Sequence, residues 1–356
     1  MAVLEAVIMP NRPTLDRIGA YYILENVEGR PLKIEFMNQT VFLPDHELSA
    51  LSDQGIFPIG VGCGETYRDR KIDGRSFGSE TSVMLYEIRS LGIIEQEDSV
   101  LDEFAHMMDQ DNKNGYLRKQ PYSGPWILQQ AYRMQQESAA EAVYRGAHLI
   151  AVHLDALRLG GVNFTMRERI KNSPAMQLLP KGPARDHQGP MTVSRYIRDM
   201  YICGLDENEI YEKTAWFVQI HDRAKHLQAT ADTIAETTRF ATFPLIGYPK
   251  VGTWANADDP YLLTALARRK DLVVMRSCKG NIIMMSKMFD LSRVANVLVN
   301  QEPGCWHYEP VPRNILANGT ESVQVKPTTC SQKMLQSVIG SFVSFMIFRL
   351  RKIINQ

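Results

Sequence analysis

Residues 3–24 read VLEAVIMPNRPTLDRIGAYYIL, and this stretch decides the fold class. An apolar run ends at Pro10, a short polar turn follows, and residues 15–27 have the apolar spacing of an amphipathic helix. The stretch therefore predicts a strand, a turn and a helix, with Asp16 in the helix's first turn. Open α/β sheets bind their ligands at the carboxyl ends of strands. A carboxylate there can hold a divalent metal ion or order a water molecule, so Asp16 is the first candidate site residue.

The same alternation of strands and helices continues through the first third of the chain. The segments expected to be strands are 3–9, 32–37 and 56–61, and those expected to be helices are 15–27 and 46–52. Strand–helix–strand units form parallel sheets with right-handed crossovers. The sequence therefore predicts an α/β fold: a parallel-sheet N-terminal domain, a long-helix middle region and a small α+β C-terminal domain.

Helices also dominate the expected middle of the chain. Helical patterns cover 79–92 and 99–108, then 125–159 as one long helix or as two with a break near Gly146, and finally 206–240. Residues 172–190 carry four prolines and are expected to form an exposed connection. In the last third, 271–276, 281–285 and 294–299 are short β-like or mixed segments. The expected domains are 1–120 (α/β), 121–240 (helical), 241–330 (small α+β) and 331–356 (an apolar and basic segment).

Composition narrows the class of protein. The 356 residues have a net charge of zero, which gives no support for whole-surface attraction to nucleic acid or to anionic lipid. Five scattered cysteines without a CxxC pair indicate reduced thiols, and no secretory leader is seen, so a cytoplasmic location is expected. Residues 337–350 are apolar but shorter than the roughly 20 residues of a bilayer span. They are expected to dock on the protein's own core, with a membrane-surface or oligomer contact as the alternative.

A charged loop follows the third expected strand. Arg68, Asp69, Arg70, Lys71 and Asp73 supply two acids that can reach a cation and three bases that can reach a phosphate. A solvated, charged turn is the alternative for such a run. Glycines at 60, 62 and 64 match neither the P-loop nor the dinucleotide fingerprint.

A third cluster reads HMMDQDN over residues 106–112. His106 and Asp109 are three residues apart, so on a helix they share a face and can ligate one metal ion. Asp111 and Asn112 are expected in the turn that follows. The alternative is a helix that simply ends in polar residues. Histidines elsewhere, among them His148 and His153, are expected to be structural.

These segments resemble the plan of the DHH phosphoesterase superfamily. Residues 9–20 (MPNRPTLDRIGA) look like its first metal-binding motif, residues 59–70 (IGVGCGETYRDR) like the segment with the Asp-His-His loop, and residues 109–112 (DQDN) like a later metal-binding aspartate. The small C-terminal domain of the superfamily is resembled by 271–285, 306–308 (WHY) and 316–319 (LANG). The resemblance implies a parallel α/β domain in which two manganese or magnesium ions activate water against phosphate esters.

The chain departs from that plan at the histidines. Met9 or Asn11 stands where the first motif has histidine, and residues around Arg68-Asp69-Arg70 replace the Asp-His-His triplet. Arginine cannot ligate a metal ion, so the resemblance implies one Mn²⁺ or Mg²⁺ ion or none. The implied roles are metal ligation by Asp16, Asp69 and Asp111, catalysis by Asp16 and Asp69, phosphate binding by Arg68, Arg70 and Lys71, and supporting contacts from Asn11, His106 and Asp109.

Three functions remain open on this evidence. The first is a divergent DHH-like phosphoesterase that hydrolyses a nucleotide, an oligonucleotide or a small phosphorylated metabolite with the help of a metal ion. The second is an inactive relative that binds a nucleotide or another phosphorylated ligand. The third is an assembly protein that presents its long helices to a partner, including a second copy of the chain.

Overall fold

The computed structural model describes residues 4–37, 45–61, 71–72, 75–94, 98–134, 139–160, 164–309, 314–318 and 328–345. The chain forms two compact units, unit 1 (Met1–Ala224) and unit 2 (Lys225–Gln356). Each unit has its own cluster of buried apolar side chains.

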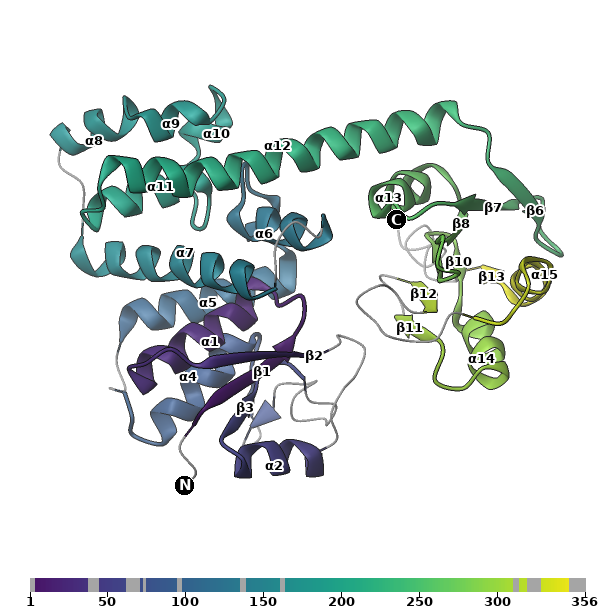
Figure 1. Ribbon diagram of the computed structural model, residues 1–356, viewed down its shortest axis with the longest axis horizontal. Helices are drawn as coiled ribbons and strands as arrows, with labels where there is room; N and C mark the ends of the chain where they lie inside the picture. The colour runs from purple at the N-terminus through teal and green to yellow at the C-terminus, as the bar shows by residue number, and fades with distance from the viewer. Residues whose placement is uncertain are drawn as a thin grey trace, which may run out of the picture. The chain divides into compact units, whose positions relative to one another are not determined.

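Unit 1 contains a three-stranded parallel sheet with β1 in the middle (Figure 1). In spatial order the strands are β2 (Lys33–Met37), β1 (Ala6–Pro10) and β3 (Ile56–Pro58). The crossovers contain α1 (Leu15–Glu28) and α2 (Asp45–Asp53). The strand–helix alternation predicted from the sequence is confirmed.

The central strand anchors the core of unit 1. Val7 stands opposite Ile34 of β2 and Phe57 of β3. Val7 and Met9 are fully buried and share one apolar cluster with Ile18 of α1. Burial on both faces of the strand explains why its sequence is a continuous apolar run rather than an alternating one.

Two helices follow the sheet, α4 (Glu80–Ser90) and α5 (Ser99–Asn114), after a hairpin of β4 (Lys71–Ile72) and β5 (Arg75–Ser76). Ser79 is the N-cap of α4, because its hydroxyl accepts a hydrogen bond from the backbone amide of Ser82.

Helix α5 is longer than expected, and this corrects one prediction. Asp111 and Asn112 lie within its last turn, not in a loop after it. The helix ends at Gly115, which adopts the left-handed conformation (φ 62°) that terminates helices. The polar run before it is compatible with helix and does not stop it.

The middle of the chain is helical, as predicted. Its elements are η1 (Leu117–Lys119), α6 (Gly124–Arg133), α7 (Ala139–Leu159), α8 (Phe164–Lys171), α9 (Pro174–Leu178), α10 (Pro183–Asp186), α11 (Val193–Ile202) and α12 (Glu207–Thr237). Helix α7 packs on α1 and α11, as Figure 1 shows.

Two details of this region differ from the sequence-based expectation. Helix α6 ends at Arg133, and α7 runs without interruption through Gly146, where the sequence suggested a possible break. Gly146 lies inside α7, where an added Cβ would come within 2.7 Å of Ile18, so this glycine serves close packing. Residues 172–190 are not an exposed connection, because they form α9 and α10 and bury Met176 and Leu179. Two of the four prolines, Pro174 and Pro183, occupy the first positions of these short helices, where proline is tolerated.

Unit 2 is built on a six-stranded mixed sheet with the spatial order β11-β12-β9-β8-β7-β6. Its strands are β6 (Ala241–Pro244), β7 (Val251–Asn256), β8 (Leu272–Arg276), β9 (Ile282–Ser286), β11 (His307–Glu309) and β12 (Ile315–Asn318). Its other elements are α13 (Pro260–Arg269), α14 (Ser292–Gln301), α15 (Gln332–Phe342), β10 (Phe289–Asp290) and β13 (Ser344–Phe345).

Unit 2 combines helices with a mixed sheet, and one of its segments differs from the sequence-based expectation. Residues 294–299 lie in α14 and not in a β-like segment. Val294, Ala295 and Leu298 are buried at helical spacing, so the apolar residues follow a period of 3.6 rather than 2. Across the described residues, no helix combines the length and apolarity that crossing a membrane requires.

Candidate functional site

Asp16 lies in the first turn of α1 and is 5% exposed. Its carboxylate accepts three hydrogen bonds, from the Glu80 amide (3.0 Å), the Thr81 amide (2.9 Å) and the Asn112 side chain (2.9 Å). The Thr81 hydroxyl donates to the Asp16 carbonyl at 2.8 Å, and Asn112 donates to the Gly78 carbonyl at 3.1 Å. Asp16 therefore joins the start of α1 to the N-terminus of α4 and to the end of α5.

This arrangement does not fit the metal ion that the sequence implied. The N-terminus of a helix carries unpaired N–H groups and a partial positive charge, which a carboxylate compensates and a cation would oppose. Asp16 already serves that purpose for α4. The described residues contain no group of three or more histidine, cysteine, aspartate or glutamate side chains that could hold a metal ion.

The other predicted acids of α5 are also engaged. Asp109 accepts a hydrogen bond from the Ser82 hydroxyl at 2.7 Å. Asp111 is buried and accepts one from the Leu117 amide at 2.8 Å, and its second oxygen lies 3.4 Å from Nε of Arg118. Asp109 thus joins Asp16 at the start of α4, whereas Asp111 holds the chain after α5. The structure brings only part of the predicted cluster together.

The remaining predicted site residues are placed as follows. The backbone N–H of Asn11 donates to the carbonyl of Met37, the last residue of β2, at 2.8 Å. Asn11 therefore extends the pairing of β1 with β2 by one hydrogen bond. Arg68, Asp69 and Arg70 lie outside the described residues, and so does the side chain of Lys71, whose backbone is part of β4.

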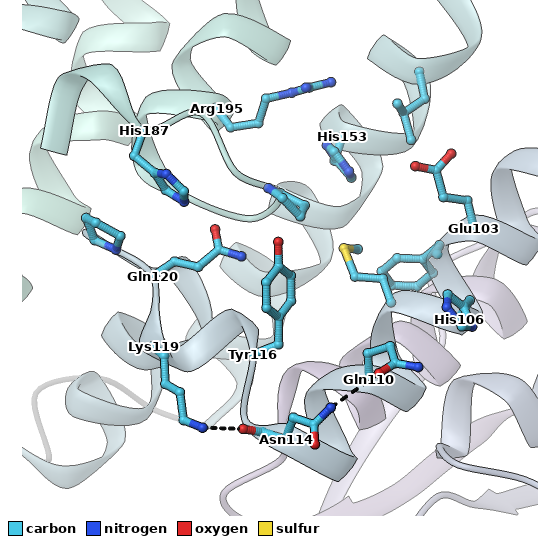
Figure 2. Close-up of a pocket in the computed structure, with 15 residues that line it drawn as sticks. Glu103, His106, Gln110, Asn114, Tyr116, Lys119, Gln120, His153, His187 and Arg195 are labelled. Atoms are coloured by element: carbon cyan, nitrogen blue, oxygen red, sulfur yellow. Dashed lines mark hydrogen bonds between the residues drawn. The ribbon is translucent and has the colours of Figure 1, made fainter. Parts of the chain in front are cut away.

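Unit 1 also contains a cavity of about 780 Å³ (Figure 2). This volume is in the range of small-molecule sites, about 300–1,000 Å³. Its ionisable lining residues, apart from Tyr116, are Glu103, His106, Lys119, His153, His187 and Arg195. His106 is a predicted site residue. The other five were not predicted.

One buried carboxylate organises a wall of this cavity. Asp199 of α11 is 1% exposed and accepts hydrogen bonds from Nδ1 of His153 and Nε of Arg195, each at 2.7 Å. Because the acceptor is a carboxylate, Nδ1 carries a proton. Nε2 of His153 and the terminal nitrogens of Arg195 have no hydrogen-bond partner among the described residues. Asp199 therefore fixes two cavity-lining side chains and leaves their other nitrogens available.

A second wall depends on a glycine. A Cβ on Gly189 would lie 2.2 Å from Oε1 of Gln120 and 2.6 Å from Nε2 of His187. Both of these side chains line the cavity, as Figure 2 shows. Glycine is thus required for His187 and Gln120 to occupy their observed positions.

The sequence offered little signal for this cavity. Arg195 and Asp199 have the i,i+4 spacing of a helical ion pair, which a search for such pairs could have found. His153 is separated from Asp199 by 46 residues, and no local pattern links them. The expectation that His153 is structural covers its bond to Asp199 but missed its position in the cavity wall.

Comparisons with known proteins give no family. No family model matches the chain, and no curated protein matches it. Among solved structures, it is similar to RecJ in complex with Mg²⁺ from Thermus thermophilus, with 9% identity and a TM-score of 0.43 over 95% of this chain and 49% of that one. It is also similar to the exonuclease RecJ bound to manganese, with 9% identity and a TM-score of 0.40 over 94% of this chain and 88% of that one. An uncharacterized protein from Helicobacter pylori has 10% identity and a TM-score of 0.18 over 95% of this chain and all of its own.

The chain spans about half the length of the first of these structures. The chain itself has a mixed α/β architecture with a parallel three-stranded sheet and a helical middle.

Proposed function

We propose that unit 1 binds a phosphorylated small molecule or nucleotide in the cavity of Figure 2. The observation that supports this is the charge of the lining. Lys119 and Arg195 are permanent cations, three imidazoles lie beside them, and Glu103 is the one carboxylate among the described lining residues. Such a lining favours an anion.

Arg195 is the main expected anion contact. Its bond to Asp199 uses Nε, so the two terminal nitrogens remain for a bidentate contact with phosphate oxygens. The same carboxylate fixes the side chain before the ligand arrives, which lowers the conformational entropy lost on binding.

We propose binding rather than metal-assisted hydrolysis. The hydrolytic mechanism inferred from the sequence needs Asp16, Asp69 and Asp111 to meet around one ion. Asp16 is engaged by the amides of α4 and Asp111 by the chain after α5, and Asp69 lies outside the described residues. No described group supplies the ligand set, so a step through a metal ion has no support here.

The test is calorimetric titration of the full chain in buffer containing EDTA, with inorganic phosphate and adenosine monophosphate as ligands. Wild-type protein should bind at least one of them, and Arg195→Ala should weaken that binding about tenfold, the equivalent of about 1.4 kcal/mol. Arg169→Ala is the matched control, because Arg169 lies on α8 and pairs with Glu207 outside the cavity lining.

Arg195→Ala removes a partner of a buried carboxylate and can therefore cost stability. Lys119→Ala avoids this, because Lys119 is exposed and its ammonium group donates only to the Asn114 carbonyl among described contacts. It should weaken binding severalfold without a change in melting temperature. The proposal is refuted if the wild type binds neither ligand, or if folded Arg195→Ala and Lys119→Ala proteins bind as well as wild type.

A further inference from the structure

Three arginines gather beside the cavity. Arg195 and Arg198 lie three residues apart on α11, a spacing that places them on one face of the helix. Arg167 lies on α8, which packs against α11, and its charge acts on Arg198. Arg195 and Arg167 are thus the two cations whose charge acts on Arg198.

The negative charge around Arg198 does not balance this cluster. Asp199 is the one acid whose charge is found to act on Arg198 among the described residues, and it is already shared by Arg195 and His153. Partial burial lowers the pKa of the Arg198 guanidinium, and Arg195 and Arg167 lower it further against the opposing effect of Asp199.

The hydrogen bonds of Arg198 show the same deficit. Its Nη1 donates to the neutral amide of Gln188 at 2.9 Å. Its Nε is buried and has no hydrogen-bond partner among the described residues. A buried donor without an acceptor costs about 1–3 kcal/mol, so such a group calls for an explanation.

Two other arginines of this region provide the contrast. Arg169, two residues from Arg167 on the same helix, donates two hydrogen bonds to the Glu207 carboxylate. Arg185 donates to the carbonyls of Leu179 and Gln177 at 2.6 and 3.0 Å. Each has internal acceptors that Arg198 lacks.

The position of Arg198 connects the cluster to the cavity. Its partner Gln188 lies between His187, which lines the cavity, and Gly189, whose lack of a side chain leaves His187 in place. Arg195 belongs to the cavity lining itself. Arg198 is therefore joined through Gln188 to the loop that carries the cavity-lining His187.

We propose that Arg198 and Arg167 form a second phosphate subsite at the rim of the cavity, so that the ligand carries two successive phosphate groups. This second subsite rests on the proposed function. One phosphate of the ligand would lie at Arg195 inside the cavity and the next at Arg198. The second phosphate supplies the acceptor for Nε of Arg198 and the negative charge that the three arginines lack.

The experiment compares inorganic phosphate with pyrophosphate by calorimetric titration of the full chain in EDTA. Pyrophosphate should bind at least tenfold more tightly than phosphate. In Arg198→Ala, pyrophosphate should bind no more than about threefold more tightly than phosphate. In Arg167→Ala, the preference for pyrophosphate should fall by a smaller factor. Arg169→Ala, the matched control on the same helix as Arg167, should keep the wild-type ratio.

Two further ligands identify the source of the phosphates. Adenosine diphosphate should share the Arg198-dependent gain over adenosine monophosphate if a nucleoside diphosphate is the ligand. The dinucleotide pApA should share it instead if the two phosphates belong to a nucleic acid strand.

The outcomes separate this inference from the proposed function. Binding of phosphate without a gain for any ligand of two phosphates refutes the second subsite alone. A gain that survives in Arg198→Ala also refutes it. Absence of binding by all the ligands refutes both proposals.

Discussion

Replacing Asp16 by asparagine should destabilise unit 1 by about 1–7 kcal/mol. The carboxylate accepts from the Glu80 and Thr81 amides and from Asn112, and it is almost completely buried. An asparagine keeps one acceptor oxygen and turns an NH₂ group towards the other donors. One or two buried N–H groups then lose their acceptor, at about 1–3 kcal/mol each. Loss of the negative charge at the N-terminus of α4 adds about 0.3–1 kcal/mol.

The measurement is urea denaturation of the full chain, followed by far-UV circular dichroism and by tryptophan fluorescence. Asp102→Asn is the matched control, because the side chain of Asp102 is half exposed and pairs with Arg89 of the neighbouring helix α4. Exposed pairs of this kind contribute about 0–1 kcal/mol. Asn112→Ala combined with Asp16→Asn should cost less than the sum of the single changes, because each removes the same hydrogen bond.

The opposite result would refute the reasoning. An acid kept for a metal ion or a reaction is normally a liability in the unliganded protein, so its removal leaves stability unchanged or raises it. If Asp16→Asn is as stable as wild type, the carboxylate does not compensate α4, and its role as a site residue must be reconsidered.

Two other changes test buried and closely packed positions of unit 1. Burial, with a smaller effect of the Lys213 charge, lowers the pKa of His148 to about 4, below the unfolded value of about 6.5. The unfolded chain then binds more protons between these values, so the His148 contribution is complete above pH 6.5 and is lost as the pH falls towards 4. After discounting for partial exposure, we expect wild type to lose about 1–2 kcal/mol more than His148→Gln between pH 7 and 4.5 in urea melts, and equal losses would disprove the assignment. Gly189→Ala should displace Gln120 and His187 and weaken phosphate binding severalfold in calorimetric titration, with less than about 1 kcal/mol of stability lost because flexible side chain ends can move. Unchanged binding would show that His187 does not contact the ligand.

The sequence predicted the parts of the fold that depend on local pattern. Residues 3–24 predicted β1, the turn and α1, because an apolar run and a period of 3.6 are written in neighbouring residues. The same holds for β2 and β3 and for α4, whose Ser79 cap is a local signal. Local pattern failed at 294–299, where β-branched residues suggested a strand despite helical spacing. It also failed at 172–190, where four prolines suggested a loop although Pro174 and Pro183 begin helices.

The candidate site was predicted less well, for a physical reason. The sequence predicted that Asp16, Asp69 and Asp111 meet. The structure instead brings Asp16 and Asp109 to the start of α4 and places Asp111 against the chain after α5. What a carboxylate does there depends on which donors face it, and those donors are backbone amides 64 and 65 residues away. Every residue except proline has a backbone N–H group, so the sequence does not show which of these groups will face a given carboxylate. The bond between His153 and Asp199 is similarly remote.

Asp16 and Asp199 show how two buried carboxylates of one core can have opposite consequences. The donors to Asp16 are two backbone amides and the side chain of Asn112, so the Asp16 carboxylate serves to hold helices together. The donors to Asp199 are His153 and Arg195, side chains that also line the cavity and keep further nitrogens for a ligand. A carboxylate that accepts from the N-terminus of a helix stabilises the fold but leaves no group for a ligand. A carboxylate that orients side chains of a cavity wall also positions groups that can contact a ligand. For this reason we place the ligand of unit 1 beside α11 and not at the edge of the parallel sheet.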